Sequence, residues 1–264
     1  MTRTRAIVVA IVALFAVGGL GIWVARDQFL SGDSVPELTL PSAAPSATAN
    51  AAASADPAAS DDPASADPTA TAAAPGGAGT AASLAGDWTI VTDASTAGYR
   101  VRERLAQLDA DSDAVGRTST GVTGTATLTL SGDTLQVTAT DIAVDTTTIA
   151  SDRNQRDNRM RNEGLQTDTF PTASFKLTAP VDVPAEALTG AIVDVTLHGD
   201  LTLHGVTKTV DIPAKAQLAD GQIQIQGAIT FPLSDYDITA PNIGGFIVSI
   251  ADEGTLEFLV TFSK

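Results

Sequence analysis

Arginine is concentrated in one short segment of this chain, with four arginines between residues 153 and 161. A guanidinium group can donate two parallel hydrogen bonds to a phosphate, so this cluster could bind an anionic group. The alternative is a solvated helix face, because Asp152 and Asp157 precede Arg156 and Arg161 by four residues and can pair with them along a helix. The sequence leaves both interpretations open.

The histidines and the closely spaced acidic residues do not form a recognisable metal-binding or catalytic pattern. His198 and His204 share one face of a predicted strand, but six residues of strand span about 20 Å, which is too far for one metal ion. We expect both histidines to lie at the surface. Asp235 and Asp237 flank Tyr236 in an alternation typical of a strand.

Several classes of function are excluded by what the chain lacks. It has no cysteine, no nucleophile motif, no glycine-rich phosphate loop and no HExxH motif. From residue 87 onward, 12 basic and 24 acidic residues give a net charge of −12, which would repel a phosphate backbone. We therefore predict a protein that is not an enzyme, needs no metal or cofactor and does not bind nucleic acid.

The last 178 residues, 87–264, alternate between polar and apolar residues. This period of two, seen for example at 122–130, 222–231 and 256–262, is typical of strands with one buried face. About nine strands are predicted, with turn signals spaced as in a sandwich or a closed barrel. Only residues 151–164 have the polar start and the glycine end of a helix.

The first 30 residues predict a membrane anchor with a short cytoplasmic tail. Residues 6–25 form an uncharged apolar stretch, which as a helix would span about 30 Å, the hydrocarbon core of a bilayer. Arg3 and Arg5 precede it, which favours a cytoplasmic N-terminus, and Trp23 lies near the far interface. The alternative is a cleaved signal peptide, whose apolar part is usually only about 7–15 residues long. Both interpretations place the rest of the chain outside the cytoplasm.

Residues 31–86 are predicted to be a disordered linker between this anchor and the folded segment 87–264. From residue 41 onward the linker consists almost wholly of Ala, Pro, Ser, Thr, Gly and Asp, and no aromatic residue occurs between Phe29 and Trp88. Such a composition cannot bury enough apolar surface to offset the entropy lost on ordering. As a coil, residues 41–86 would span about 40 Å, which is long enough for a spacer.

A set of motifs in the folded segment resembles a known family. The motifs are Trp88–Ile90, the run from Arg156 to Arg161, FPTASF at 170–175, LTLHGVTK at 201–208, and the spaced residues Gly227, Phe231, Leu233, Tyr236 and Ile238. Together they resemble the YceI-like family over essentially all of residues 87–264. The pairing of FPTASF with the downstream LTLHGVTK is the most specific part of the resemblance.

The resemblance implies an all-β fold, an eight-stranded antiparallel lipocalin-like barrel with one short capping helix. Here this barrel would be preceded by a transmembrane helix and a disordered linker. The resemblance also implies export and the binding of a polyisoprenoid or similar long-chain lipid in the barrel lumen. The chain departs from simpler family members in a long charged loop at 106–118, and in having a span and tether where a cleaved signal is usual.

We expect apolar residues on the inward strand faces to contact the lipid. If the arginine cluster is a binding site and not a solvated helix face, its arginines could receive a prenyl phosphate head group at the barrel mouth. Gly227 lies between Ile225 and Ile229 and is expected to point into the lumen and leave volume there. The predicted ligand-binding residues are Leu128, Val137, Ile223, Ile225, Gly227, Ile229, Phe231, Leu256, Phe258, Arg156 and Arg161.

These observations predict a single-pass cell-membrane protein whose extracytoplasmic barrel holds a polyisoprenoid or similar lipid. An eight-stranded barrel is just wide enough either to hold one small ligand or to be filled by its own side chains. The alternative is therefore a packed barrel without a ligand that contacts a cell-envelope partner through its surface. The expected partners are an isoprenoid-type lipid and the membrane, and a homodimer is also open.

Overall fold

A computed structural model describes residues 35–41, 80–105, 111–241 and 247–264. The predicted span at 6–25 and most of the predicted linker lie outside these ranges. Within them, no helix is both long enough and apolar enough to cross a membrane.

The described chain is mostly β-structure, and all its strand pairs are antiparallel. The strands are β1 (Gly86–Ile90), β2 (Thr96–Leu105), β3 (Asp111–Thr118), β4 (Val122–Ser131), β5 (Thr134–Asp145), β6 (Thr172–Leu177), β7 (Val181–Asp182), β8 (Val193–Leu203), β9 (Val206–Ala219), β10 (Gln222–Pro232) and β11 (Ile247–Ser263).

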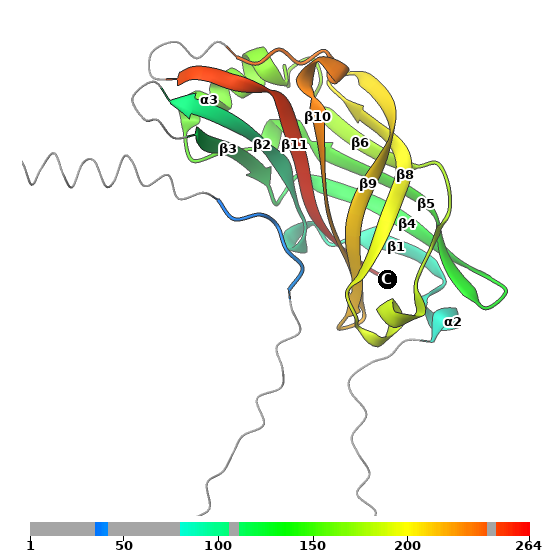
Figure 1. Cartoon of the computed structure of the whole chain (residues 1–264). Coiled ribbons are helices and arrows are strands. Elements are labelled where there is room, and N and C mark those ends of the chain that lie inside the picture. The colour runs from blue at the N-terminus through cyan, green and yellow to red at the C-terminus, as the bar shows by residue number, and fades with distance from the viewer. Residues whose placement is uncertain (1–34, 42–79, 106–110, 242–246) are drawn as a thin grey trace, which may run out of the picture.

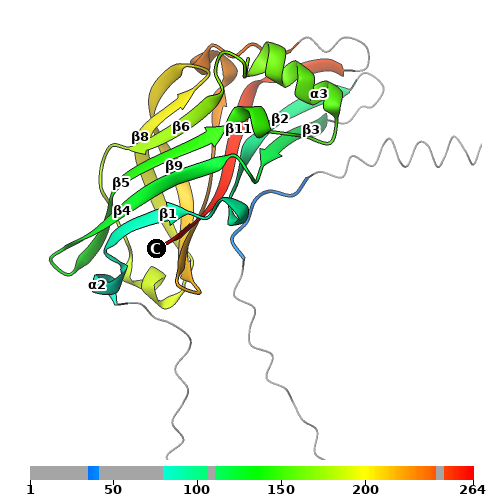
Figure 2. The same ribbon diagram turned by 180° about the vertical axis from the view of Figure 1, so that it is seen from behind.

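Eight of these strands close into a barrel in the order β1-β4-β5-β6-β8-β9-β10-β11 (Figures 1 and 2). The ring closes where Thr89 and Ile90 of β1 pair with Ser263 and Phe262 of β11. Strands β2 and β3 extend the wall beyond β11. The eight-stranded antiparallel barrel predicted from the family resemblance is therefore confirmed.

Strand β3 occupies residues that the sequence predicted as a long charged loop, so the prediction for 106–118 was wrong over 111–118. Polar side chains on this strand pair across the β2–β3 ladder instead of alternating with apolar ones. Asp113 lies 3.2 Å from Arg100 and 3.7 Å from Arg102. These charged side chains form ion pairs across the two strands. The segment therefore lacks the alternation of polar and apolar residues that marks a half-buried strand.

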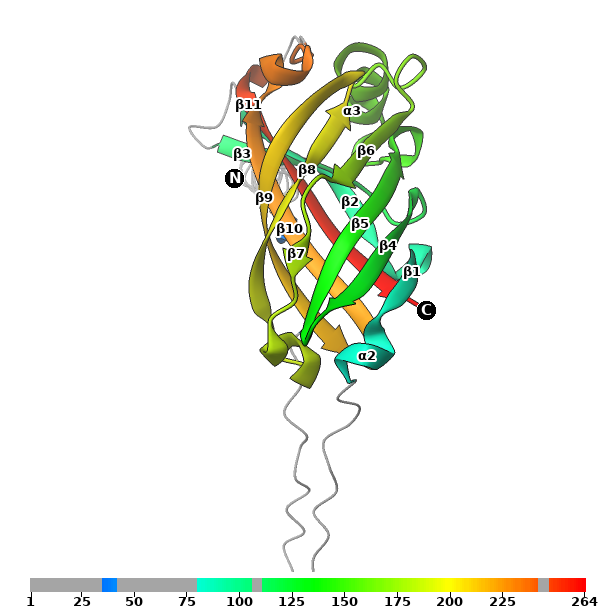
Figure 3. The same ribbon diagram turned by 90° about the vertical axis from the view of Figure 1, so that its right-hand side faces the viewer.

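The predicted helix at 151–164 is confirmed in shorter form. It consists of α3 (Asn154–Arg159), which continues into the π-helical turn η3 (Met160–Gly164). The other short elements are α2 (Ala81–Leu84) and the 3₁₀ turns η1 (Thr92–Ala94), η2 (Thr146–Thr148), η4 (Ala185–Thr189) and η5 (Leu233–Tyr236). Helices α2 and α3 lie at opposite ends of the barrel (Figure 3).

The interior contains two clusters of buried apolar residues. One, which includes Trp88 and Phe262, also contains Leu84 of α2, and the other is centred on Tyr236 and Phe231. The Trp88 indole donates a hydrogen bond to the backbone oxygen of Leu84 at 2.9 Å. Helix α2 therefore packs into the same core as the strands, although it precedes the predicted folded segment 87–264.

Candidate ligand cavity

The barrel encloses an apolar cavity. It measures about 160 Å³, counted as the space in which the centre of a water molecule can lie. On the same measure about 10–15 Å³ holds one water, so the barrel is not filled by its own side chains. Among the described residues no charged side chain lines the cavity, and its few polar lining residues are Tyr99, Thr140, Thr146, Ser174 and Thr255.

Most of the apolar residues predicted from strand alternation line this cavity. They are Leu128, Val137, Ile223, Ile225, Phe231, Leu256 and Phe258. Of the predicted strand residues, Gly227, which is buried, and Ile229, which packs against the Tyr236 cluster, do not line it, and neither do the predicted Arg156 and Arg161.

Gly227 does not leave open volume in the lumen as expected. It pairs with Phe258 across the β10–β11 ladder, and a Cβ built on Gly227 would lie 2.6 Å from Cζ of that ring. The phenyl ring therefore fills the space that the glycine vacates, as aromatic side chains do beside glycines in strands. A larger residue at position 227 would first have to displace Phe258.

Sequence reasoning missed the cavity residues that lie outside clear strand alternation. Ile149, Met160 and Leu165 come from the segment around α3 and η3, and Tyr99 comes from β2. Met160 belongs to the motif that runs from Arg156 to Arg161, and this motif was the sequence feature that could have indicated a role for the region. Its position in the cavity depends on how α3 closes the barrel end, which strand periodicity does not report.

The apolar space continues toward the α2 end. A second pocket of about 60 Å³ is lined by Leu84 of α2 and Ala187 of η4, among others. The residues that line both this pocket and the main cavity are Leu128, Val137, Leu197, Ile223 and Ile225. This shared wall makes the two spaces neighbours along the barrel, which suits an elongated apolar ligand.

At the α3 end a small pocket of about 30 Å³ adjoins the cavity through Tyr99, Val101, Met160, Leu233 and Ile238, which line both. This pocket is also lined by charged residues, namely Glu103, Arg156 and Arg159. The mostly apolar lumen therefore has a charged boundary at the α3 end.

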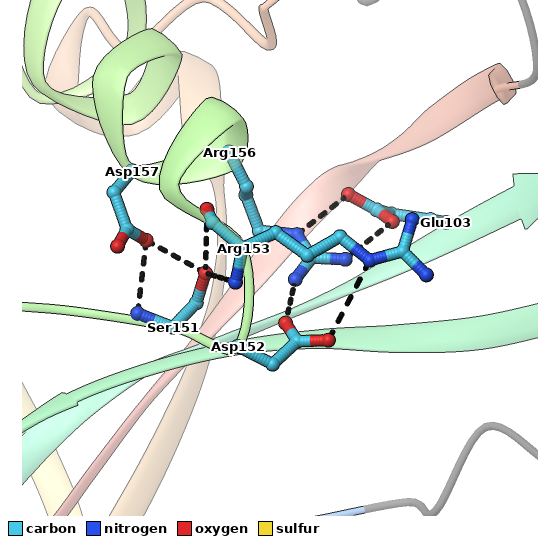
Figure 4. Close-up of polar contacts among 6 residues, drawn as sticks. All are labelled: Glu103, Ser151, Asp152, Arg153, Arg156 and Asp157. Atoms are coloured by element: carbon cyan, nitrogen blue, oxygen red, sulfur yellow. Dashed lines mark hydrogen bonds and ion pairs between the residues drawn. The ribbon is translucent and has the colours of Figure 1, made fainter.

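Arg156 is already paired with carboxylates at this boundary (Figure 4). Its guanidinium group lies 3.3 Å from the carboxylate of Glu103 and also contacts Asp152, in the predicted i,i+4 pair. Burial acts to lower the pKa of Arg156, but the hydrogen bond and charge of Glu103, with Asp152, outweigh it and raise the pKa. Because its side chain is only 12% exposed, Arg156 does not lie on a solvated helix face.

Arg161 has a different environment. Its Nη2 donates to the backbone oxygen of Ile149 at 3.1 Å, while its Nε is buried without a hydrogen-bond partner among the described residues. Asp157, predicted to pair with Arg161, instead accepts hydrogen bonds from the amide and hydroxyl of Ser151 (Figure 4). Arg161 thus lies beside cavity-lining Ile149 with unused hydrogen-bonding capacity.

Tyr99 lines both the main cavity and the small pocket at the α3 end. Burial raises the pKa of Tyr99 above its ordinary value, with Arg156 opposing and nearby acidic residues adding to the increase. The phenol therefore stays protonated at neutral pH and can donate a hydrogen bond to a polar atom at this end of the lumen.

The histidines are split between the surface and the interior. His198 is exposed and lies 2.5 Å from Asp211. His204 is buried against Phe170 and hydrogen-bonds through Nδ1 to the backbone oxygen of Tyr236, so the expected surface position was wrong for this residue. The described ranges contain no group of three or more metal-ligating side chains.

Comparisons with known proteins agree with this barrel. Residues 88–262 match the YceI-like domain family. A UPF0312 protein of Vibrio parahaemolyticus is 32% identical over 114 residues, which are 40% of this chain and only 57% of that protein.

Two solved structures are also similar. A polyisoprenoid-binding domain from Saccharophagus degradans, implicated in plant cell wall breakdown, has a TM-score of 0.51 at 18% identity, covering 67% of this chain and 97% of that domain. BcnA of Burkholderia cenocepacia has a TM-score of 0.48 at 16% identity, covering 65% of this chain and 98% of that protein. The Saccharophagus degradans domain supports the barrel fold.

Proposed function

This chain belongs to the YceI-like family, and on that premise we propose that its barrel binds one long-chain lipid, of polyisoprenoid or similar type, in its lumen. The observation that carries the proposal is the mostly apolar cavity, which is lined by no charged residue within the described ranges and adjoins a second, mostly apolar pocket toward α2. The similar domain from Saccharophagus degradans is described as polyisoprenoid-binding, which supports this choice of ligand.

The chemistry of the lining selects a hydrocarbon chain. Apolar surface removed from water contributes about 25 cal/mol per Å², and a long chain in this lumen would gain that along its whole length. A polar group in the same place would lose its hydrogen bonds to water without finding partners. The lumen therefore favours an unbranched or methyl-branched hydrocarbon over a sugar, a nucleotide or a peptide.

The polar end of the lipid would lie at the α3 end. Tyr99 lines the pocket there and can donate through its phenol. Arg161 lies beside cavity-lining Ile149, carries a positive charge and has a buried Nε without a partner among the described residues. Arg156 was also predicted to contact a head group, but its two carboxylate partners compensate its charge.

If the head group is anionic, Arg161→Gln should reduce the lipid retained after gel filtration several-fold. Equal retention by this variant and the parent protein would remove Arg161 from the binding site.

We place the barrel outside the cytoplasm, held at the cell membrane by residues 1–30 through a single span. The support for this part of the proposal is the uncharged stretch at 6–25 with arginines on its N-terminal side. A lipid-binding barrel held beside a bilayer would exchange or sequester lipid at the outer face of that membrane.

The direct test is an organic-solvent extract of the purified full-length protein, analysed by mass spectrometry. We expect about one long-chain lipid per barrel, because the lumen has room for a single chain. The absence of any lipid from freshly purified protein, together with failure to bind added polyprenyl phosphate or polyprenol, would contradict the proposal. The ligand-free interaction domain would then be the better interpretation.

A matched pair of variants tests whether the lipid lies in the lumen. Leu128 lines both the main cavity and the pocket toward α2, whereas the next residue, Thr129, is exposed. Leu128→Trp should narrow the passage between the two spaces, so the extracted lipids should shift to shorter chains or fall in amount. Thr129→Trp adds the same side chain outside and should leave the extract unchanged. The same lipid profile in both variants would place the lipid elsewhere.

A further inference from the structure

Residues 35–41, with the sequence VPELTLP, lie against the barrel although 38 residues, 42–79, separate them from the folded domain. Figure 1 shows this segment in blue on the side of the barrel formed by β2 and β3. An extended chain of that length reaches about 130 Å, so connectivity alone does not fix where the segment lies. Its position must therefore come from its own contacts.

Three side chains of the barrel bind backbone oxygens of this segment. Arg100 of β2 donates to Val35 at 2.8 Å and Arg117 of β3 donates to Pro36 at 2.5 Å. At the other end of the segment, Gln217 of β9 donates to the oxygen of Pro41 at 3.1 Å. The segment thus crosses the wall from β3 toward β9 and is bound at both ends.

The two arginines are held in place before they reach the segment. Arg117 lies 2.7 Å from the buried carboxylate of Glu257, and Arg100 lies 3.5 Å from the same group. Glu257 holds both guanidinium groups, and the Nη2 nitrogen of each arginine that contacts Glu257 also donates to a backbone oxygen of the segment. The barrel wall therefore presents fixed donors, which an extended peptide can meet with its main chain.

The side chains of the segment alternate as in a half-buried strand. Leu40 is 8% exposed and Leu38 is half-buried, whereas Glu37 and Thr39 are exposed. Gln217, which donates to Pro41, is only 4% exposed, as expected for a residue beneath the segment. The flanking prolines have no amide hydrogen to leave unpaired and restrict the free chain, which lowers the entropy lost on docking.

We propose that the outer wall across β3, β2, β11, β10 and β9 is a peptide-docking surface whose occupant is residues 35–41 of the same chain. Docking makes residues 42–79 a closed loop and fixes the point at which residues 1–34 leave the barrel. The predicted 40 Å spacer is then not the link to the membrane. This inference rests on the contacts of residues 35–41 and is independent of lipid binding.

Docking would greatly shorten the distance that the chain can span between the predicted anchor and the barrel. Only residues 31–34 lie between the anchor segment 1–30 and the docked segment, and fully extended they span about 14 Å. Docking would therefore hold the barrel close to the bilayer with the β2–β3 wall nearest the anchor. Release of the segment would lengthen the reach to that of the whole linker, about 40 Å as a coil.

The chain has no cysteine, so two spin labels can be introduced at chosen positions of the full-length protein in detergent. Labels at Glu37→Cys and Thr129→Cys, both exposed positions, report the distance between the segment and β4 by pulsed electron double resonance. Docking predicts one narrow distance distribution. A free segment would instead give a broad one, since residues 38–79 as a coil span about 35 Å.

Two variants with the same added charge separate docking from chance proximity. Leu40→Asp places a carboxylate against the wall and should broaden the distribution to that of the free coil, while Thr39→Asp places it in solvent and should leave the distribution narrow. Circular dichroism should show an intact barrel in both. A broad distribution in the parent protein, or a narrow one in Leu40→Asp, would overturn the proposal. So would loss of the narrow distance on dilution with unlabelled chain, because the segment would then dock on a second copy.

Discussion

At the scale of single residues, Arg156 and Arg161 show how neighbouring arginines on one motif can differ in their roles. Arg156 reaches Glu103, whose side chain comes from β2 and is 3% exposed, and so joins α3 to the barrel wall. Arg161 has a backbone oxygen as its described partner and a buried Nε without one. We infer that Arg156 stabilises the closed barrel end and that Arg161 is the better candidate for ligand contact.

This difference predicts the effect of Arg156→Gln on stability. Removing the guanidinium group leaves the Glu103 carboxylate buried without a counter-charge, which typically costs about 3–5 kcal/mol. Arg153→Gln is the control, because Arg153 pairs with Asp152 at 3.6 Å where both side chains are more than half exposed. Such an exposed pair contributes about 0–1 kcal/mol. The free energies of unfolding from urea titrations should differ accordingly, and equal values would mean that Glu103 is not held by Arg156.

The cavity residues could be predicted where strand alternation determines which way a side chain points. They could not be predicted where contacts between segments distant in the sequence determine it. Ile223 and Ile225 follow from a period of two, because one inward residue fixes its neighbours on the strand. The ring of Phe258, on another strand, occupies the space beside Gly227. This depends on the rotamer of Phe258, which the local sequence around Gly227 does not reveal. Tyr99 was missed as a cavity residue because its role depends on closure of the barrel end by α3.

At the scale of elements, the unexpected pieces are β3 and α2, and each has a physical reason. The pairing of charges across β2 and β3 hides the alternation expected of a strand. Helix α2 is only four residues long and lies at the end of an alanine-rich stretch, so its composition resembles that of the linker. Its order comes from tertiary contacts, since such a short helix is not stable alone.

Helix α2 should therefore contribute measurably to the stability of the barrel. Leu84 is buried, and Lys264 at the C-terminus donates through Nζ to the backbone oxygens of Ser83 and Ala85 at 2.6 and 2.7 Å. A chain that starts at residue 87 loses these contacts and the indole hydrogen bond of Trp88. Burial of one leucine and a few hydrogen bonds together contribute about 2–4 kcal/mol. Urea unfolding of this chain, compared with one that starts at residue 80, should show that loss; identical midpoints would make α2 dispensable.

At the scale of the whole molecule, the proposed position of the barrel outside the cytoplasm rests on the charges around the predicted span. Lys and Arg on the cytoplasmic side set the orientation, and Arg3 and Arg5 before residues 6–25 outnumber the single Arg26 after them. A reporter enzyme that requires disulfides for activity, fused after Lys264, should therefore be active, because disulfides form outside the cytoplasm. Replacing Arg3 and Arg5 with glutamine removes the excess and should lower the reporter activity, while the total amount of fusion protein serves as the control.

The fusion should also stay in the membrane fraction after a high-salt wash, since a hydrophobic span is not released by screening charges. A soluble product whose first residue lies near position 26 would show instead that the apolar stretch is a cleaved signal, and the barrel would then be free to carry lipid away from the membrane.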